Sequence, residues 1–127
     1  MNFEKVLFAF FVLLALTLNF SFFVGELADP NVHNVFELFA AIVVSLIATI
    51  MKFGDRTQLG ALLIASSLVA DLQLITAAVV WGYAANIANG QSDPSTIASI
   101  VSLSGGAVLA NIVSVVLLTA EALTARR

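Results

Sequence analysis

The sequence contains no cysteine, only one histidine and only two prolines among its 127 residues. Without cysteine the chain cannot be a disulfide-stapled scaffold, and a single histidine does not by itself make a structural zinc site. Lysine and arginine together number five, against eight acidic residues, which excludes the basic surface that nucleic-acid binding requires. We therefore expect no metal, no cofactor and no nucleic acid among the ligands of this protein.

Catalytic motifs are also missing. The sequence has no second histidine, no thiol, no nucleophile elbow and no glycine-rich phosphate loop, and its seven glycines are scattered or paired. We therefore expect no catalytic residues and a protein that is not an enzyme.

What the sequence has in excess is apolar residues. They make up 61% of the chain, whereas charged residues make up 10%, compared with about 25% in an ordinary soluble domain. A globular domain of this length leaves a large share of its surface exposed, and so few charged side chains could not cover it in water. The composition therefore excludes a disordered tail and predicts an integral membrane protein covered by the lipid bilayer.

The apolar residues form four runs, at approximately residues 3–25, 34–53, 58–86 and 95–123. A helix of about 20 residues crosses the hydrocarbon core of a bilayer, so each run is long enough to be a transmembrane helix. The last two runs exceed a perpendicular crossing, and we expect them to tilt or to project beyond the headgroups. We predict an all-α fold in which residues 1–127 form a single domain, an up-down-up-down bundle of four transmembrane helices.

The connections between the runs carry turn signals. An aspartate followed by a proline, at 29–30 and again at 93–94, places a capping carboxylate before a residue that suits the first helical turn. The polar break at 54–56 is too short for anything but an antiparallel helix hairpin.

The basic residues indicate an orientation. They lie at the start of the first run, at the end of the second run and in the turn that follows it, and after the fourth run: Lys5, Lys52, Arg56, Arg126 and Arg127. The other two connections contain none. The positive-inside rule therefore predicts that both termini lie in the cytoplasm.

Asp71 is the most informative residue inside the runs, because Arg56 lies 15 positions before it and Asn86 lies 15 after it. An ionised aspartate at the centre of a membrane costs about 2.5–3.5 kcal/mol on insertion scales, so a favourable interaction must offset this cost. One interpretation is a carboxylate that binds a proton or a cation and faces a cavity. The other is a protonated or hydrogen-bonded aspartate that joins helices.

Asn111 in the fourth run reaches nearly the same depth as Asp71, and the two side chains could meet there. Helical spacing places Ser67 on the stripe that carries Asp71. A second stripe, in the fourth run, carries Ser104, Ala107, Asn111 and Ser114. These residues either surround an ion or simply let helices pack closely and hydrogen-bond. Gln73 lies about 200° around the helix from Asp71, so we expect it to need another partner, for example in a neighbouring subunit.

The adjacent glycines Gly105 and Gly106 mark the place where a helix could break, because glycine weakens a helix and removes side-chain bulk. A break within a membrane would line a cavity with carbonyl groups that coordinate ions. The alternative is an unbroken helix in which the two glycines allow close packing.

Glu37 and Asn19 are candidates for an outer vestibule. Glu37 stands three residues after Asn34, which is the spacing of a helix capping box, so its carboxylate either completes the start of the second helix or attracts cations to the entrance. Asn19 lies near this depth in the first run, where it either extends a polar path inward or bonds a neighbouring helix. His33, in the loop nearby, is expected to be solvated or to cap a helix.

Three segments carry a resemblance to a known family: Asn-Val-Phe-Glu-Leu-Phe-Ala-Ala-Ile at 34–42, Lys-Phe-Gly-Asp-Arg-Thr-Gln-Leu-Gly-Ala at 52–61, and Leu-Val-Ala-Asp-Leu-Gln at 68–73. With these segments the chain resembles a family of small four-helix bacterial inner-membrane proteins of uncharacterised function. The likeness extends over most of the chain. It implies a bacterial inner (cytoplasmic) membrane location and the same topology, but it brings no activity and no functional residues.

Two functions fit these observations. The first is a homo-oligomeric channel or ion-coupled transporter, in which Asp71 and Asn111 form the central site and the outer carboxylates favour cations or protons. The second is an accessory or assembly subunit of a larger membrane complex with no transport activity of its own. It is motivated by the small-residue helix faces and by the near absence of mass outside the membrane.

Overall fold

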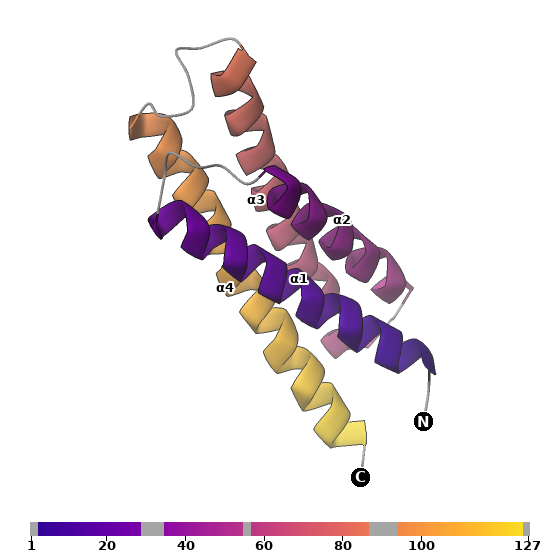
Figure 1. Ribbon diagram of the computed structural model, residues 1–127. Helices are drawn as coiled ribbons and strands as arrows, with labels where there is room; N and C mark the ends of the chain where they lie inside the picture. Colours follow the sequence, from indigo (N-terminus) through magenta and orange to yellow (C-terminus); the bar gives the residue numbers. More distant parts are fainter. Residues whose placement is uncertain (1–2, 29–34, 55–56, 87–93, 126–127) are drawn as a thin grey trace.

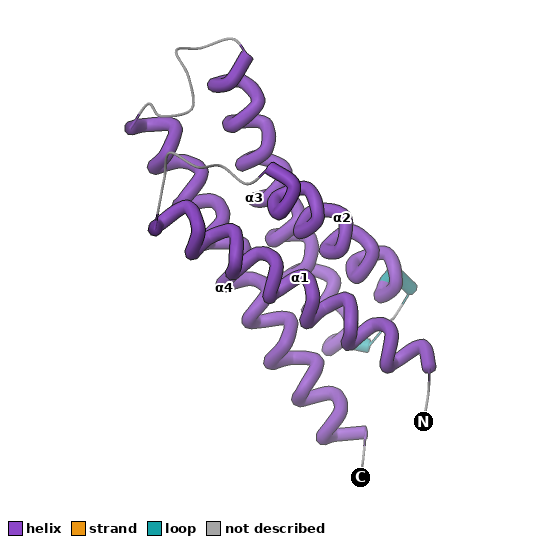
Figure 2. Tube along the Cα trace, in the orientation of Figure 1, coloured by secondary structure: helices purple, strands orange, loops and turns teal. Residues whose placement is uncertain are grey.

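The computed structural model describes residues 3–28, 35–54, 57–86 and 94–125. These residues form four helices and no strand: α1 (Phe3–Ala28), α2 (Val35–Lys52), α3 (Gln58–Asn86) and α4 (Pro94–Ala125) (Figures 1 and 2). The predicted all-helical fold is confirmed, and the helix ends differ by at most three residues from the ends of the apolar runs.

The helices form a ring of four neighbours. α1 contacts α2 and α4, and α3 contacts the same two helices, whereas the diagonal pairs α1–α3 and α2–α4 are not in close backbone contact. The chain reverses direction from each helix to the next, and both termini lie at the same end of the bundle (Figure 1). We call this end, where α2 also turns into α3, the terminal end, and the opposite end the loop end. The longer helices α3 and α4 project beyond α1 and α2 at the loop end.

Local sequence defines the turn between α2 and α3. Gly54 adopts a φ of 97°, a left-handed conformation that favours glycine, and this stops α2 just after Lys52. Thr57 then caps α3, because its Oγ1 accepts a hydrogen bond of 2.9 Å from the backbone N–H of Gly60. The predicted hairpin therefore begins on a glycine turn and ends on a threonine cap.

Replacing this cap should weaken the bundle measurably. We expect Thr57→Ala to lower the free energy of unfolding by about 1 kcal/mol, because the N–H of Gly60 loses its acceptor. Unfolding in detergent micelles, followed by circular dichroism, measures this change. Thr57→Ser retains the hydroxyl and should match the parent protein; equal stability of the alanine and serine variants would contradict the role of the cap.

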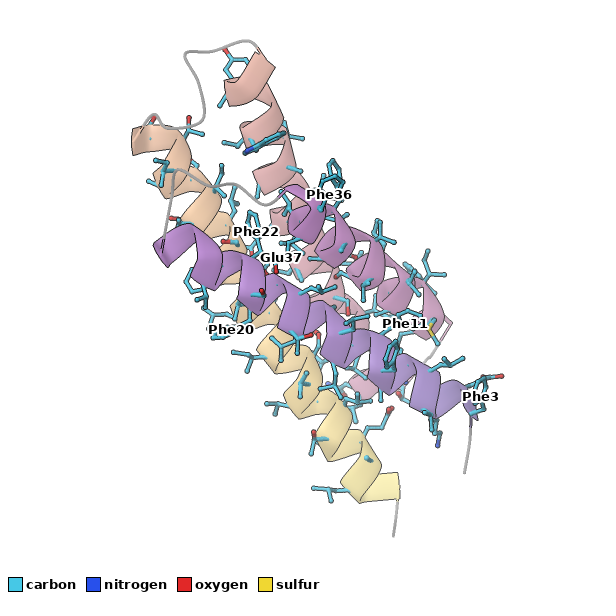
Figure 3. The ribbon with its side chains drawn as sticks, in the orientation of Figure 1. Phe3, Phe11, Phe20, Phe22, Phe36 and Glu37 are labelled. Carbon is cyan, nitrogen blue, oxygen red and sulfur yellow. The ribbon has the colours of Figure 1, made fainter. Side chains whose placement is uncertain are left out.

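The surface of the bundle is largely apolar, and its interior contains polar as well as apolar side chains. Large apolar side chains are exposed along every helix, and Phe3, Phe20 and Phe36 point away from the bundle (Figure 3). The buried residues, in contrast, include asparagine, serine, threonine and aspartate. An apolar exterior around a partly polar interior suits a hydrocarbon solvent rather than water.

The hydroxyl groups of threonines on the exterior form hydrogen bonds within their own helices. Each donates to a backbone carbonyl three or four residues earlier in its own helix, with oxygen–oxygen distances of 2.7 to 3.0 Å: Thr17, Thr76, Thr119 and Thr124. Lipid offers no acceptor for an exposed hydroxyl, so bonding within the helix removes that cost.

Three of the helices are long and apolar enough to cross a membrane, over Phe3–Gly25, Gln58–Ala84 and Ser95–Thr124. This supports the prediction of a membrane protein. The remaining helix, α2, has 18 residues and is the shortest of the four. Its role as a fourth crossing, and the orientation of the bundle, stay predictions.

Candidate functional site

Two apolar clusters fill the bundle. The cluster near the loop end, which we call the loop-end cluster, consists of Phe22, Leu38, Ala41, Ile42, Ala70, Leu74, Ile100, Ala107 and Ala110. The smaller one, which we call the terminal cluster, consists of Phe8, Val12, Ala48 and Leu63, with Phe11, Val115, Leu117 and Leu118 packed against it. Every helix contributes to both groups, so the interior is sealed by apolar side chains towards both ends.

Buried polar residues lie at the level of the bundle where the two apolar clusters meet. We call them the polar layer: Asn19 from α1, Ser45 and Thr49 from α2, Ser66, Ser67 and Asp71 from α3, and Asn111 and Ser114 from α4. All are at most 8% exposed. Along α1, for example, Asn19 lies between Val12 of the terminal cluster and Phe22 of the loop-end cluster. The sequence predicted Asp71, Asn111, Ser67 and Asn19 as candidate residues, and the fold buries all four.

Asp71 is held by two hydroxyl groups of α2. Ser45 Oγ donates to Asp71 Oδ1 over 2.5 Å, and Thr49 Oγ1 donates to Asp71 Oδ2 over 2.7 Å. Thr49 Oγ1 also lies 2.9 Å from the carbonyl oxygen of Ser45, which fixes the position of its side chain. The carboxyl group is 3% exposed, so its partners are protein groups on a neighbouring helix. This arrangement offsets part of the cost of a buried carboxylate.

The suggested meeting of Asp71 and Asn111 is not what the structure shows. The Asp71 carboxyl bonds to α2 instead, and the Nδ2 atom of Asn111 is buried with no hydrogen-bond partner. Equal distance from the helix ends gave the depth of each residue but not the direction in which its side chain points around the helix.

Asn19 is also buried without partners. Its side chain is 0% exposed, and neither Oδ1 nor Nδ2 has a hydrogen-bond partner. The expectation of an outer vestibule that includes Asn19 is therefore corrected. Positions 8, 12, 15, 19 and 22 share the inward face of α1, which places Asn19 inside the bundle. A fully buried amide that makes no hydrogen bond has unused capacity to bind a polar ligand or water.

Ser66 and Ser114 connect α3 to α4 in the polar layer, with their Oγ atoms 2.6 Å apart. Ser66 Oγ also lies 3.0 Å from the carbonyl oxygen of Leu63, so it can donate there and accept from Ser114. Ser67, the predicted neighbour of Asp71, is buried at 5% exposure.

This serine pair gives a second testable expectation. Ser66→Ala and Ser114→Ala, made singly and together, should show a coupling of about 0.6 kcal/mol, the average for hydrogen bonds between membrane helices. Unfolding in micelles measures each variant. In the matched control, Ser66→Ala is combined with Thr119→Ala, which lies on the exterior and bonds within its own helix, and these two changes should be additive. Additive effects of the two serine changes would contradict a direct bond.

The glycine pair packs against two different helices. A Cβ on Gly105 would lie 2.9 Å from the Phe23 ring of α1, and a Cβ on Gly106 would lie 2.7 Å from both Oε1 and Nε2 of Gln73 in α3. α4 continues as one helix through both glycines, so close packing rather than a break explains them. Gln73 therefore packs against α4 of its own chain, while its Oε1 atom is buried without a hydrogen-bond partner among the described residues, so a partner in a neighbouring subunit stays a prediction.

Ser104 lies outside the polar layer. It is fully buried between Ile100 and Ala107 of the loop-end cluster, and its hydroxyl donates to the carbonyl oxygen of Val101 over 3.2 Å. Its hydrogen-bonding capacity is used within α4, so Ser104 shares the stripe of Asn111 without joining its site.

Glu37 lies at the junction of α1 and α2 near the loop end (Figure 3). Its Oε2 accepts a hydrogen bond of 2.5 Å from the hydroxyl of Ser21 in α1. It occupies the first turn of α2, where a negative charge is favourable, and its side chain is partly exposed. Its predicted capping partner Asn34 lies outside the described residues, as do His33, Asp29-Pro30, Asp93, Asp55, Arg56 and the final two arginines.

Ser45 and Thr49, the residues that bind Asp71, were not singled out from the sequence. A signal was present, because these are the only hydroxyl residues of α2 and they stand four positions apart, on one face of the helix. Two hydroxyl donors at this spacing can both reach a buried acid on a neighbouring helix, and the second run offers no other such pair.

The fold and the polar layer define a small four-helix protein with an apolar exterior, three helices able to cross a membrane, and one acid buried among hydroxyl and amide groups. The chain belongs to a family of unknown function, DUF6394, whose model matches residues 32–122, more than half of the sequence. The predicted resemblance to an uncharacterised family is thereby confirmed. No curated protein and no solved structure is significantly similar to the chain.

Proposed function

We propose that this protein conducts protons or another monovalent cation across a membrane through the interior of its helix bundle, with Asp71 as the binding carboxyl group. The observation that carries the proposal is the polar layer. It combines a carboxyl group that is 3% exposed with two buried amides, Asn19 and Asn111, that have unpartnered polar atoms. A purely structural contact between helices has no need of unpartnered amides, whereas a path for water or cations uses them.

The charge of the polar layer determines the class of ion. Its described residues include one acid and no base, and its other polar groups are hydroxyls and amides. One carboxylate with neutral oxygen ligands balances a single positive charge, whereas a Ca²⁺ or Mg²⁺ site draws on more oxygen ligands, carboxylates among them. Anions would meet the negative charge of Asp71. A proton or a monovalent cation is therefore the best match.

The proposal places the terminal end of the bundle in the cytoplasm of a bacterium, in the inner membrane. Lys5 and Lys52 lie at this end, and the sequence places three arginines beside the same ends of the helices. This asymmetry supports the orientation through the positive-inside rule. The proposed cation path runs within each bundle, because the residues of the polar layer all come from one chain. Assembly into a homo-oligomer remains part of the prediction.

Flux into liposomes tests the proposal. Purified protein should carry protons, Na⁺ or K⁺ down an imposed gradient, read with a pH-sensitive dye or an ion-selective dye, while Mg²⁺ and Cl⁻ gradients should decay as in empty liposomes. Flux of none of the three monovalent cations would contradict the proposal. Flux of one of them alone identifies the ion.

A second candidate, an accessory subunit, is supported by one surface feature. A shallow groove between α3 and α4 is lined by Thr76, Val80, Ala98, Ser99, Ser102 and Leu103. Small and hydroxyl side chains let another transmembrane helix approach closely. Gentle solubilisation followed by native mass measurement separates the two candidates. A homo-oligomer or monomer supports the transport proposal, and foreign chains in fixed stoichiometry support the subunit.

A further inference from the structure

An ion pair joins two helices that face each other diagonally. Lys52 Nζ, at the end of α2, lies 3.3 Å from Oε1 and 3.4 Å from Oε2 of Glu121 in α4. The backbones of α2 and α4 are not in close contact, so this pair reaches across the bundle at the terminal end. The two side chains are 17% and 31% exposed, respectively, which distinguishes the pair from a fully solvated surface contact.

The ammonium group of Lys52 also contacts α1. It lies 5.1 Å from the centroid of the Phe8 ring, a distance typical of a cation–π interaction. Phe8 belongs to the terminal cluster and is 7% exposed. Lys52 therefore contacts side chains from two other helices, Glu121 of α4 and Phe8 of α1.

The Lys52–Glu121 pair lies close to the residues that bind the Asp71 carboxyl group. Lys52 lies three residues after Thr49, on the same face of α2 and about 4.5 Å further along the helix axis. Thr49 holds Asp71. Ala48 of the terminal cluster, which is the smaller of the two apolar clusters, stands next to Thr49. On α2 the ion pair therefore lies about one helical turn beyond both this cluster and the polar layer.

We infer that the Lys52–Glu121 pair is a gate that closes the terminal end of the bundle and separates Asp71 from water on that side. The inference rests on the proposed function, because it assigns control of access to the same site. While the pair is formed, the ammonium group of Lys52 and the Phe8 ring block the way for a cation. When it opens, Glu121 is released as a carboxylate that attracts a cation towards the polar layer.

Accessibility of an engineered thiol tests the gate without any measurement of flux. The chain has no cysteine, so Ala48→Cys places a single thiol in the terminal cluster, at a position that is 3% exposed. The probe is a membrane-impermeant methanethiosulfonate that carries a quaternary ammonium group. In this background Lys52→Met and Glu121→Gln should each raise the modification rate by roughly tenfold, which corresponds to about 1.4 kcal/mol in the closing equilibrium.

The reversed pair provides the decisive comparison. Lys52→Glu combined with Glu121→Lys restores opposite charges and should return the rate to that of the parent. Lys5→Met, which removes an exposed positive charge at the same end and leaves both Lys52 and Glu121 in place, should leave the rate unchanged. Unchanged rates in both single variants, or a reversed pair as reactive as either of them, would overturn the gate.

A second thiol position separates opening from unfolding. Ala41→Cys lies in the loop-end cluster at 0% exposure and should stay protected in every variant. Reaction at both positions reports a disrupted bundle and counts against the gate. The thiol measurement needs no ion gradient, so it tests the gate separately from transport. If the variants expose the thiol at position 48 but the protein carries no cation, the proposed function is refuted and the gate is not.

Discussion

Asp71→Asn is expected to reduce cation flux to the level of empty liposomes while leaving the bundle at least as stable as the parent. Asparagine has nearly the shape of aspartate, and its amide oxygen can still accept a hydrogen bond from Ser45 or Thr49. The change removes the negative charge that a cation needs and the carboxyl group that binds and releases a proton. It also removes the cost of a charge within the membrane, about 2.5–3.5 kcal/mol on insertion scales.

Asp71→Ala separates the two roles of this side chain. Without an acceptor, the hydroxyls of Ser45 and Thr49 lose their bonds to α3 and are left buried, and we expect a loss of roughly 1–3 kcal/mol in the free energy of unfolding. Glu4→Gln, at an exposed position in the first turn of α1, is the matched control and should retain full flux. Parental flux in Asp71→Asn would remove this residue from the mechanism and leave it a contact between helices.

Gly106→Leu is expected to be the most damaging single change to packing. A Cβ added at this position would lie 2.7 Å from the amide group of Gln73, so a branched side chain must displace Gln73 or push α3 away from α4. Overpacking of this kind costs about 1–3 kcal/mol. Unfolding in micelles, followed by circular dichroism, measures the loss.

Gly82→Leu is the matched control for this prediction. It lies on α3, and a Cβ there meets no atom within 4 Å. We expect it to match or exceed the parent, because glycine is about 1 kcal/mol worse than alanine within a helix. In the Gly106→Leu background, Gln73→Ala should recover much of the loss. A Gly106→Leu protein as stable as Gly82→Leu would contradict the close packing of Gln73.

The helices were predictable because a single property, apolar length, determines them in a membrane. Gly54 and Pro94 mark helix boundaries through their backbone geometry, so they too were readable from the sequence. The position of Asp71 near the middle of α3 followed from its distance to both ends of the third run. Each of these predictions depends on one segment of the chain.

The contacts between helices were not predictable in the same way. Asp71 meets Ser45 and Thr49 rather than Asn111 because of the rotation of each helix about its own axis, which apolar runs of uniform composition leave undefined. The pairing of Lys52 with Glu121, which lie 69 positions apart, depends in addition on which helices face each other diagonally. The rotation of each helix and its position along its neighbours determine which polar side chains meet in a bundle. The depth of a residue in its helix does not determine either of these.

α2 has polar contacts with all three other helices, at three levels. Near the loop end Glu37 accepts from Ser21 of α1, in the middle Ser45 and Thr49 hold Asp71 of α3, and at the terminal end Lys52 pairs with Glu121 of α4. A rigid helix transmits any displacement along its whole length, so a shift of α2 alters all three contacts together. Occupancy of Asp71 by a cation and opening at Lys52 should therefore influence each other reciprocally, as linked equilibria require.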